Sequence, residues 1–391
     1  MLDDLRREFP ALLTRVSGKR LAYLDAAATS LMPRAVIEAV SHAAMYGNPG
    51  RGVHALAEAA TVAIAEARAE VARAINARPA DIVFTSGATA AINLVAQTLS
   101  LATGDVVIAS ELEHHSNLLP WQRLCAERGA RLVLAPVHAN GIDRERLFAL
   151  LDERVKLVAI AHVSNVLGTV APIAELAARA HAVGARLLVD GAQAIAHLAV
   201  DVDALGCDFY AFSGHKVYGP PGVGVLWGRG ELLAAMPPWQ LGGGMVLDDE
   251  APRYRDPPER FEAGTPNTPG IVGLAAALRW LRSLDRAAIA AGEASVHAQL
   301  IDAITGAGGT ILGRPTLAVV AFTLGRYHPH DVATIADGEG VALRSGHHCA
   351  APIHRRFGVD ASTRASVACY SGTDDVAQLA RALAKVREVL G

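Results

Sequence analysis

The stretch FYAFSGHKVYGPPGVGVLW, at residues 209–227, decides the fold of this chain. Two short apolar runs, at 209–212 and 223–227, are rich in aromatic or β-branched residues and have the length of buried strands. Lys216 lies between them, close to the tip of the first predicted strand. Lysine is rarely placed where it must lose water, and burial lowers its pKa and makes the amine a nucleophile suited to Schiff-base chemistry. The stretch therefore predicts a reactive site at the end of a buried strand.

Five similar apolar runs precede this stretch, and segments of helix length separate them. The runs are at residues 81–85, 105–109, 131–135, 155–160 and 186–189, and the amphipathic segments include 88–101, 118–128 and 173–183. Strands separated by helices of this length form βαβ crossovers, which give a mostly parallel sheet with helices on both faces. We therefore predict an α/β fold whose larger domain holds a mostly parallel seven-stranded sheet covered by helices.

The second half of the chain predicts a smaller α+β domain. Residues 237–269 hold two Pro-Pro pairs, a Gly-Gly-Gly run and several charges, which indicates an irregular connection between lobes or a subunit contact. Beyond them we expect helices at 271–284, 287–305, 330–336 and 373–390 and strands at 317–324 and 341–343. We place the larger domain at residues 20–262 and the smaller domain at residues 1–19 and 263–391.

Composition and charge narrow the class of protein. The chain has 391 residues, of which 51% are hydrophobic and 19% charged, so it can bury a large core and is not intrinsically disordered. Its 36 Lys and Arg against 39 Asp and Glu leave no basic surplus, so neither nucleic acid nor an anionic membrane is an implied partner. Four widely spaced cysteines without a C-x-x-C pair predict neither a disulfide framework nor a zinc ribbon.

The N-terminal sequence and the hydropathy pattern bear on where the protein works. MLDDLRREFP alternates acid and base and has no apolar stretch typical of a secretory signal. No apolar run reaches the roughly 18 residues that a transmembrane helix needs. We therefore expect a cytoplasmic protein with no membrane partner, in which a free thiol can persist.

Three motifs follow predicted strands, at the sheet edge where open α/β sheets bind ligands. SGAT at 86–89 opens a predicted helix, whose free N–H groups suit a phosphate, although the motif alone is also typical of an ordinary helix N-terminus. Asp190 ends an apolar run, where it is either a helix cap or the partner of a cation. Together with Lys216, these motifs supply the phosphate anchor, the carboxylate for a pyridinium nitrogen and the lysine that a pyridoxal phosphate enzyme needs.

Nine ordered blocks then identify a family. They are YLDAAA at 23–28, RGVH at 51–54, EHHSN at 113–117, HVSN at 162–165, DGAQ at 190–193, SGHK at 213–216, FEAGTPNT at 261–268, RSGHHCA at 344–350 and TRAS at 363–366. With them the chain resembles, nearly end to end, the class V aminotransferase family of fold type I pyridoxal phosphate enzymes. Within that family it is similar to the type II cysteine desulfurases of the SufS/CsdA kind.

The resemblance implies a role for each cofactor-binding residue. Lys216 would bind pyridoxal 5'-phosphate as a Schiff base, Asp190 would pair with the pyridinium nitrogen, and Gln193 would hydrogen-bond the phenolic oxygen. His114 would stack on the ring. The phosphate would be held by Ala88, Thr89, Ser213 and His215, with Thr265 of a second subunit.

The resemblance also implies the activity and the substrate site. Cys349 would be the nucleophile that accepts sulfur from L-cysteine, leaving L-alanine. Asn165 and Arg364 would hold the substrate carboxylate, and Arg344 would lie near the mouth of the site. The enzyme would be a homodimer that passes persulfide sulfur to a small acceptor protein (SufE- or SufU-like) for iron–sulfur cluster assembly. No metal ligand is expected.

Other interpretations of the same residues stay open at this point. The chain could be a selenocysteine lyase, or another class V enzyme such as a racemase or transaminase in which Cys349 is incidental. It could also be a non-catalytic scaffold, although a scaffold needs none of the cofactor residues. His347, His348 and Cys349 could form a soft metal site with His354 as a further ligand, or Cys349 could be an inert buried thiol.

The chain departs from the family pattern in three places. Ala90 replaces the usual acid after the phosphate loop, which reads SGAT where many type II members have GTT. Residues 48–50, Asn-Pro-Gly, stand where relatives commonly carry a histidine, and the chain is trimmed around residues 306–316. These changes bear on substrate preference and partner choice more than on the reaction class.

Overall fold

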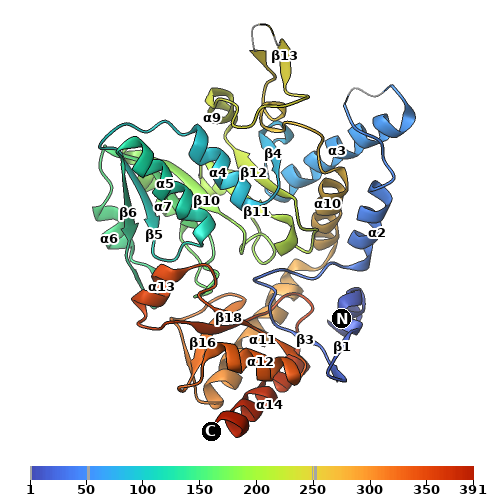
Figure 1. Ribbon diagram of the computed structural model, residues 1–391, viewed down its shortest axis with the longest axis vertical. Coiled ribbons are helices and arrows are strands. Elements are labelled where there is room, and N and C mark those ends of the chain that lie inside the picture. Colours follow the sequence, from blue (N-terminus) through green and yellow to red (C-terminus); the bar gives the residue numbers. More distant parts are fainter. Residues whose placement is uncertain (1, 51–52, 249, 251–252) are drawn as a thin grey trace.

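A seven-stranded sheet forms the centre of the larger lobe in the computed structural model, which describes residues 2–50, 53–248, 250 and 253–391 (Figure 1). The strand order is β4 (Ile82–Thr85), β12 (Gly224–Gly228), β11 (Phe209–Ser213), β10 (Arg186–Asp190), β9 (Val155–Ala161), β5 (Val106–Ser110) and β6 (Arg131–Ala135). All neighbours are parallel except β12, which is antiparallel to both β4 and β11. Each of the seven strands predicted for this sheet is present within one residue at either end. The predicted fold class is confirmed.

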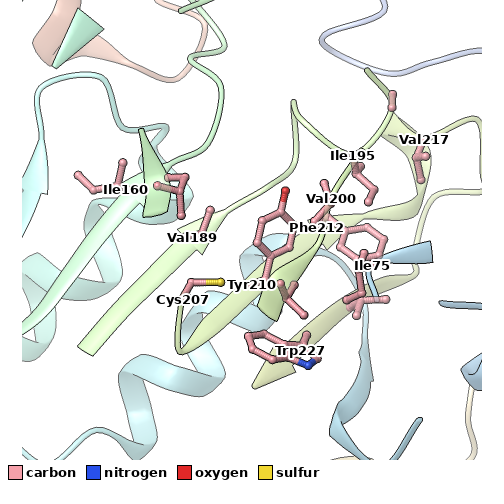
Figure 2. Close-up of a cluster of buried hydrophobic side chains, with 14 of the residues drawn as sticks. Ile75, Ile160, Val189, Ile195, Val200, Cys207, Tyr210, Phe212, Val217 and Trp227 are labelled. Carbon is pink, nitrogen blue, oxygen red and sulfur yellow. The ribbon is translucent and has the colours of Figure 1, made fainter. Parts of the chain in front are cut away.

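Both faces of this sheet are buried because alternate residues of each strand enter different apolar clusters. In β5, Val106 and Ile108 join one cluster while Val107 joins the other. The second cluster includes α4 (Ala88–Thr98) and α5 (Leu119–Arg128), whose Trp121 is fully buried. The first is covered by α7 (Ile173–Ala182) and other elements, and Figure 2 shows part of it around the buried ring of Tyr210.

The smaller lobe contains a four-stranded antiparallel sheet of order β15-β16-β19-β18 (Figure 1). These strands are β15 (Gly309–Ile311), β16 (Val319–Leu324), β19 (Ser362–Ser366) and β18 (Arg344–Gly346). They pack with α11 (Arg286–Gly306), α12 (Pro329–Gly338) and α14 (Thr373–Leu390), which match three predicted helices. The predicted strand at 341–343 is present as β17 (Val341–Ala342), which pairs in parallel with β3 (Ala22–Tyr23).

The N-terminal segments connect the two lobes. Helices α2 (Arg34–Ala43) and α3 (Ala55–Ala74) pack against α10 (Thr268–Ser283). Preceding them, α1 (Leu2–Arg7) and a short 3-10 helix (Pro10–Leu13) flank Phe9, whose ring meets those of Tyr218, Trp280 and Tyr370 at 4.7 to 6.1 Å between centroids.

Within the stretch at 237–269, β13 (Val246–Asp248) pairs antiparallel with β14 (Arg253–Tyr254), at the top of Figure 1. Helix α10 follows it and packs against α2 and α3. The domain boundary at residues 262/263 stays a prediction. Among the described residues, no helix combines the length and the apolar character needed to cross a membrane.

Candidate active site

The carboxyl ends of the central strands meet the smaller lobe at a cavity of about 200 Å³. This cavity contains most of the residues that the sequence predicted for the site. They are Ala88, Thr89, His114, Asn165, Asp190, Ser213, His215, Lys216, Arg344, Cys349 and Arg364. The structure thus brings together side chains from residues 88 to 364 of the chain.

Two predicted residues lie outside the lining of this cavity. Gln193 is buried next to it, and its Nε2 donates to the backbone oxygen of Ala27 at 2.8 Å. Thr265 lines two other cavities, one of about 720 Å³ shared with Asn48 and His54. The motif residues Arg51 and Gly52 lie outside the described part of the chain.

Lys216 and Asp190 form the charged pair of the cavity, and the fold gives them opposite pKa shifts. Burial lowers the pKa of Lys216 from 10.5 to about 8, although the charge of Asp190 opposes this change. Burial raises the pKa of Asp190, against the charge of Lys216 and a hydrogen bond from the backbone N–H of Ala192 at 3.0 Å. An amine with this pKa is partly neutral at pH 7 and can act as a nucleophile.

The N-terminus of α4 presents hydroxyl groups and N–H groups to the same cavity. The N–H of Ala88 donates to Ser213 Oγ at 2.8 Å, and the hydroxyls of Thr89 and Ser116 are 2.7 Å apart. The backbones pack closely here, since a Cβ on Gly224 would lie 2.4 Å from the Cα of Gly87. A helix N-terminus with hydroxyl donors is suited to a phosphate dianion.

His114 enters the cavity in a neutral form. Burial lowers its pKa to about 3, and the charge of Lys216 acts in the same direction. Its Nδ1 accepts the N–H of Ser116 at 3.1 Å, which places the ring tautomer with hydrogen on Nε2. A neutral imidazole at this position can stack on an aromatic ring and donate from Nε2.

Glu113, the residue before His114, is fully buried and supports the turn at residues 114–117. Ser110 Oγ donates to its carboxylate at 2.5 Å and Asn117 Nδ2 at 2.7 Å, and Trp121 donates to Asn117 Oδ1. Burial raises the pKa of Glu113 to about 8. In the sequence this glutamate is marked only by its place in the EHHSN motif, and its role was not predicted.

Arg364 is the buried cation of the cavity, with 3% of its side chain exposed. It donates to the backbone oxygen of Asn165 at 3.0 Å and to Asp25 Oδ1 at 3.2 Å. Its Nε has no partner among the described residues, so it keeps a donor for a ligand. Arg344 lies 3.9 Å from the other oxygen of Asp25. The role of Asp25 was missed, and its only signal was its place in the YLDAAA motif.

Cys349 is the exposed cysteine of the cavity wall, whereas Cys125, Cys207 and Cys369 are buried. The inert interpretation of Cys349 as a buried thiol is therefore wrong. Burial raises the pKa of all three other thiols.

The loop that carries Cys349 belongs to the smaller lobe but is bonded to the larger one. The backbone oxygen of Cys349 accepts the N–H of His115 at 2.7 Å, and that of His348 accepts Asn165 Nδ2 at 2.7 Å. Within the described residues, no group of three or more His, Cys, Asp or Glu side chains is placed to hold a metal ion.

The site selects for one kind of cofactor. A partly neutral amine condenses with an aldehyde, a buried carboxylate suits a protonated ring nitrogen, and the α4 N-terminus suits a phosphate. Pyridoxal phosphate carries all three groups, and the residues present fit it. Fold and site together define the class of pyridoxal phosphate enzymes with fold type I.

Comparisons with known proteins give the particular family. Residues 22–379 match the family Aminotransferase class-V, and the chain belongs to this family. Over its full length it is 48% identical to a cysteine desulfurase of Dickeya dadantii and 45% identical to one of Klebsiella pneumoniae, covering 98% and 99% of those proteins.

Solved structures agree with this assignment. The cysteine desulfurase CsdA of Escherichia coli, in its S-sulfonic acid form, superposes with a TM-score of 0.93 at 38% identity, covering 100% of this chain and 99% of that one. The apo cysteine desulfurase of Thermococcus onnurineus gives a TM-score of 0.94 at 36% identity, with 99% and 98% coverage.

Proposed function

We propose that this chain is a pyridoxal phosphate-dependent cysteine desulfurase, which converts L-cysteine to L-alanine and leaves a persulfide on Cys349. The observation that carries the proposal is that an exposed thiol, Cys349, shares one cavity with Lys216, Asp190 and the buried cation Arg364. A racemase or transaminase has no use for a thiol at this place. Relatives that are 48% and 45% identical are cysteine desulfurases.

Each cofactor-binding residue has a place in this proposal. Pyridoxal phosphate, when bound, supplies an electron sink for negative charge at the substrate Cα. Lys216 would hold its aldehyde carbon, Asp190 its ring nitrogen and Gln193 its phenolic oxygen, and His114 would stack on its ring. Its phosphate would be held by Ala88, Thr89, Ser213 and His215.

The chain's own residues bind the substrate and move its proton. Arg364 and Asn165 hold the carboxylate of L-cysteine, and Arg344 stands at the entrance. The amine of Lys216, whose neutral fraction is larger because burial lowers its pKa, takes the proton from the substrate Cα onto Nζ.

Cys349 then receives the sulfur. Its thiolate Sγ forms a bond to the substrate sulfur while the substrate Cβ–S bond breaks. The electron pair of that bond stays with carbon, and Cβ takes up a proton to become the methyl group of alanine. The proton held on Lys216 Nζ returns to Cα. The thiolate is the reactive form of a cysteine nucleophile.

The proposal includes a homodimer and an external sulfur acceptor. Thr265 lines cavities other than that of Lys216, so a second subunit is needed if it contacts a phosphate. Four exposed apolar side chains lie within three residues of the lining of the 720 Å³ cavity and support a subunit contact: Val53, Leu56, Leu241 and Leu247. A small acceptor protein (SufE- or SufU-like) would take the persulfide toward iron–sulfur cluster assembly in the cytoplasm.

Purified protein incubated with L-cysteine and a reductant tests the activity. We expect alanine and sulfide in equal amounts, loss of both in Cys349→Ala, and retention in Cys369→Ala, which removes a buried thiol. Release of alanine from L-cysteine by Cys349→Ala would contradict the role of this thiol. Activity of that variant on selenocysteine alone would identify a selenocysteine lyase.

Two further variants test the cofactor site and the dimer. Lys216→Ala should lose covalent attachment of the cofactor, and a protein that keeps it would contradict the assignment. Thr265→Ala should weaken cofactor binding, and unchanged affinity would count against a contact across the dimer.

A further inference from the structure

Three buried side chains form a continuous hydrogen-bonded chain behind Cys349. His348 Nε2 lies 3.0 Å from Ser362 Oγ, and His354 Nε2 lies 2.9 Å from the same oxygen. His354 Nδ1 lies 3.1 Å from the backbone oxygen of Ala350. Ser362 is completely buried, and the two histidines are 6% and 1% exposed.

The donors and acceptors of this chain can be placed in only one way. The carbonyl of Ala350 can only accept, so His354 carries its hydrogen on Nδ1. Burial lowers the pKa of His354, so its Nε2 is a bare acceptor and Ser362 must donate to it. The single hydrogen of Ser362 is then used, and His348 Nε2 must donate to Ser362 Oγ. Since burial lowers the pKa of His348 to about 2, its Nδ1 is left without a hydrogen.

The loop that contains His348 and Cys349, which this hydrogen-bonded chain supports, has an unfavourable backbone conformation. His348 and Cys349 have φ of 51° and 55°, in the left-handed region that residues other than glycine seldom occupy. Two such residues in succession persist only where the surroundings hold them. Backbone hydrogen bonds to His115 and Asn165 hold one side of the turn, and the side chain of His348 holds the other.

Packing alone would not require these three polar side chains. Buried polar atoms carry a cost unless each is hydrogen-bonded, and His348 Nδ1 meets no donor among the described residues. Apolar side chains of similar volume would fill the space without that cost. The three polar side chains are therefore best explained by the turn at His348 and Cys349, which they hold in place.

We propose that His354, Ser362 and His348 are positioning residues, which fix the turn that presents Cys349 to the cavity. Ser362 is the centre of the device, because its hydroxyl is the contact of both histidines. The proposal rests on the proposed function of Cys349 as the sulfur-accepting nucleophile.

Ser362→Ala tests the proposal, since it removes both contacts at once. We expect the cofactor content and the affinity for L-cysteine, followed by the absorbance of the bound cofactor, to stay within twofold of wild type. Alanine formation should fall at least tenfold in kcat with little change in KM. Ser362→Thr, which keeps the hydroxyl, should recover turnover to within threefold.

Thr363→Val, which removes a buried hydroxyl and keeps the size of the side chain, provides the matched control on the same strand. Thr363 is also buried, but its hydroxyl makes only a 3.4 Å contact to Pro329 and does not join the chain. We expect this variant to turn over like wild type. Wild-type kcat in Ser362→Ala, or an equal loss in Thr363→Val, would overturn the proposal.

The histidine tautomers give a measurement that needs no variant and no activity. Nitrogen-15 spectra of the wild-type holoenzyme should show His348 with hydrogen on Nε2 and His354 with hydrogen on Nδ1. The opposite tautomer of either histidine would overturn the proposal even if Ser362→Ala failed to fold. Failure of the proposed function is separate, because it would appear as alanine formation that survives in Cys349→Ala.

Discussion

The low pKa of Lys216 leads to a prediction that can be measured without the cofactor. Burial lowers this pKa from 10.5 to about 8, whereas the negative charge of Asp190 raises it. Asp190→Asn removes that charge while keeping the size of the side chain. The pKa of Lys216 should therefore fall further, below its wild-type value.

The magnitude follows from the two pKa values. At pH 7 an amine of pKa 8 is about 9% neutral, whereas one of pKa 10.5 is about 0.03% neutral. The neutral, reactive fraction of Lys216 at pH 7 should thus be about 300-fold that of an unperturbed lysine. The corresponding free energy is about 3 kcal/mol, at 1.36 kcal/mol for each pKa unit.

Competitive labelling of the apo-protein with acetic anhydride measures this pKa directly. The chain has only three other lysines, Lys19, Lys156 and Lys385, and these serve as internal references in the same digest. Labelling of Lys216 should rise with pH and level off above pH 8, and in Asp190→Asn the midpoint should move to lower pH. A midpoint near 10.5 in wild type, or an upward shift in the variant, would refute the reasoning.

Three further predictions concern the turn at His114, the sheet edge and the phosphate site. The folded state keeps a proton on Glu113 up to about pH 8 that the unfolded chain loses above 4.5, so wild-type stability should fall by up to about 1.4 kcal/mol per pH unit between pH 5 and 8. Glu113→Gln should lack this slope in urea unfolding, and equal slopes would contradict the assignment. Gly191→Ala would place a Cβ 2.1 Å from the buried ring of Tyr210 and should cost about 3 kcal/mol or more, whereas Gly292→Ala in α11, where a Cβ meets nothing, should stabilise by about 0.5–1 kcal/mol. Thermal unfolding compares the two, and similar values would be the opposing result. Ser213→Ala removes the acceptor of the Ala88 N–H and should weaken cofactor binding about fivefold, roughly 1 kcal/mol, in an equilibrium titration; unchanged affinity would count against this contact.

The central sheet could be predicted because each of its strands has a clear pattern in the sequence. Each is a short apolar run buried on both faces, bounded by turns and separated from the next by a helix-length segment. The strands of the smaller lobe that carry the site were missed. β18 (RSG) and β19 (STRAS) are polar, because their side chains point into hydrogen-bonded networks around Asp25 and Ser362, and no apolar pattern marks them.

The site residues also divide into those that the sequence could place and those that it could not. Lys216, Asp190 and Thr89 stand within four residues after the ends of predicted strands, so the sheet places them at one edge before any contact is known. Asp25 and Arg364 are 339 residues apart, and Ser362 meets His348 only through the pairing of β18 with β19. Such partners follow from tertiary structure, and a single sequence gives no signal for them.

The backbone hydrogen bond from His115 to Cys349 fixes the position of residue 349 independently of the chemistry of its side chain. Because peptide groups make the contact, the path of the loop does not depend on which side chain occupies position 349. Another nucleophile, such as selenocysteine, would stand where the thiol stands now. The loop that carries Cys349 belongs to the smaller lobe, whereas its hydrogen-bond donors, His115 and Asn165, belong to the larger lobe. A rocking motion of the lobes would therefore have to break these hydrogen bonds before it changed the distance from Cys349 to Lys216.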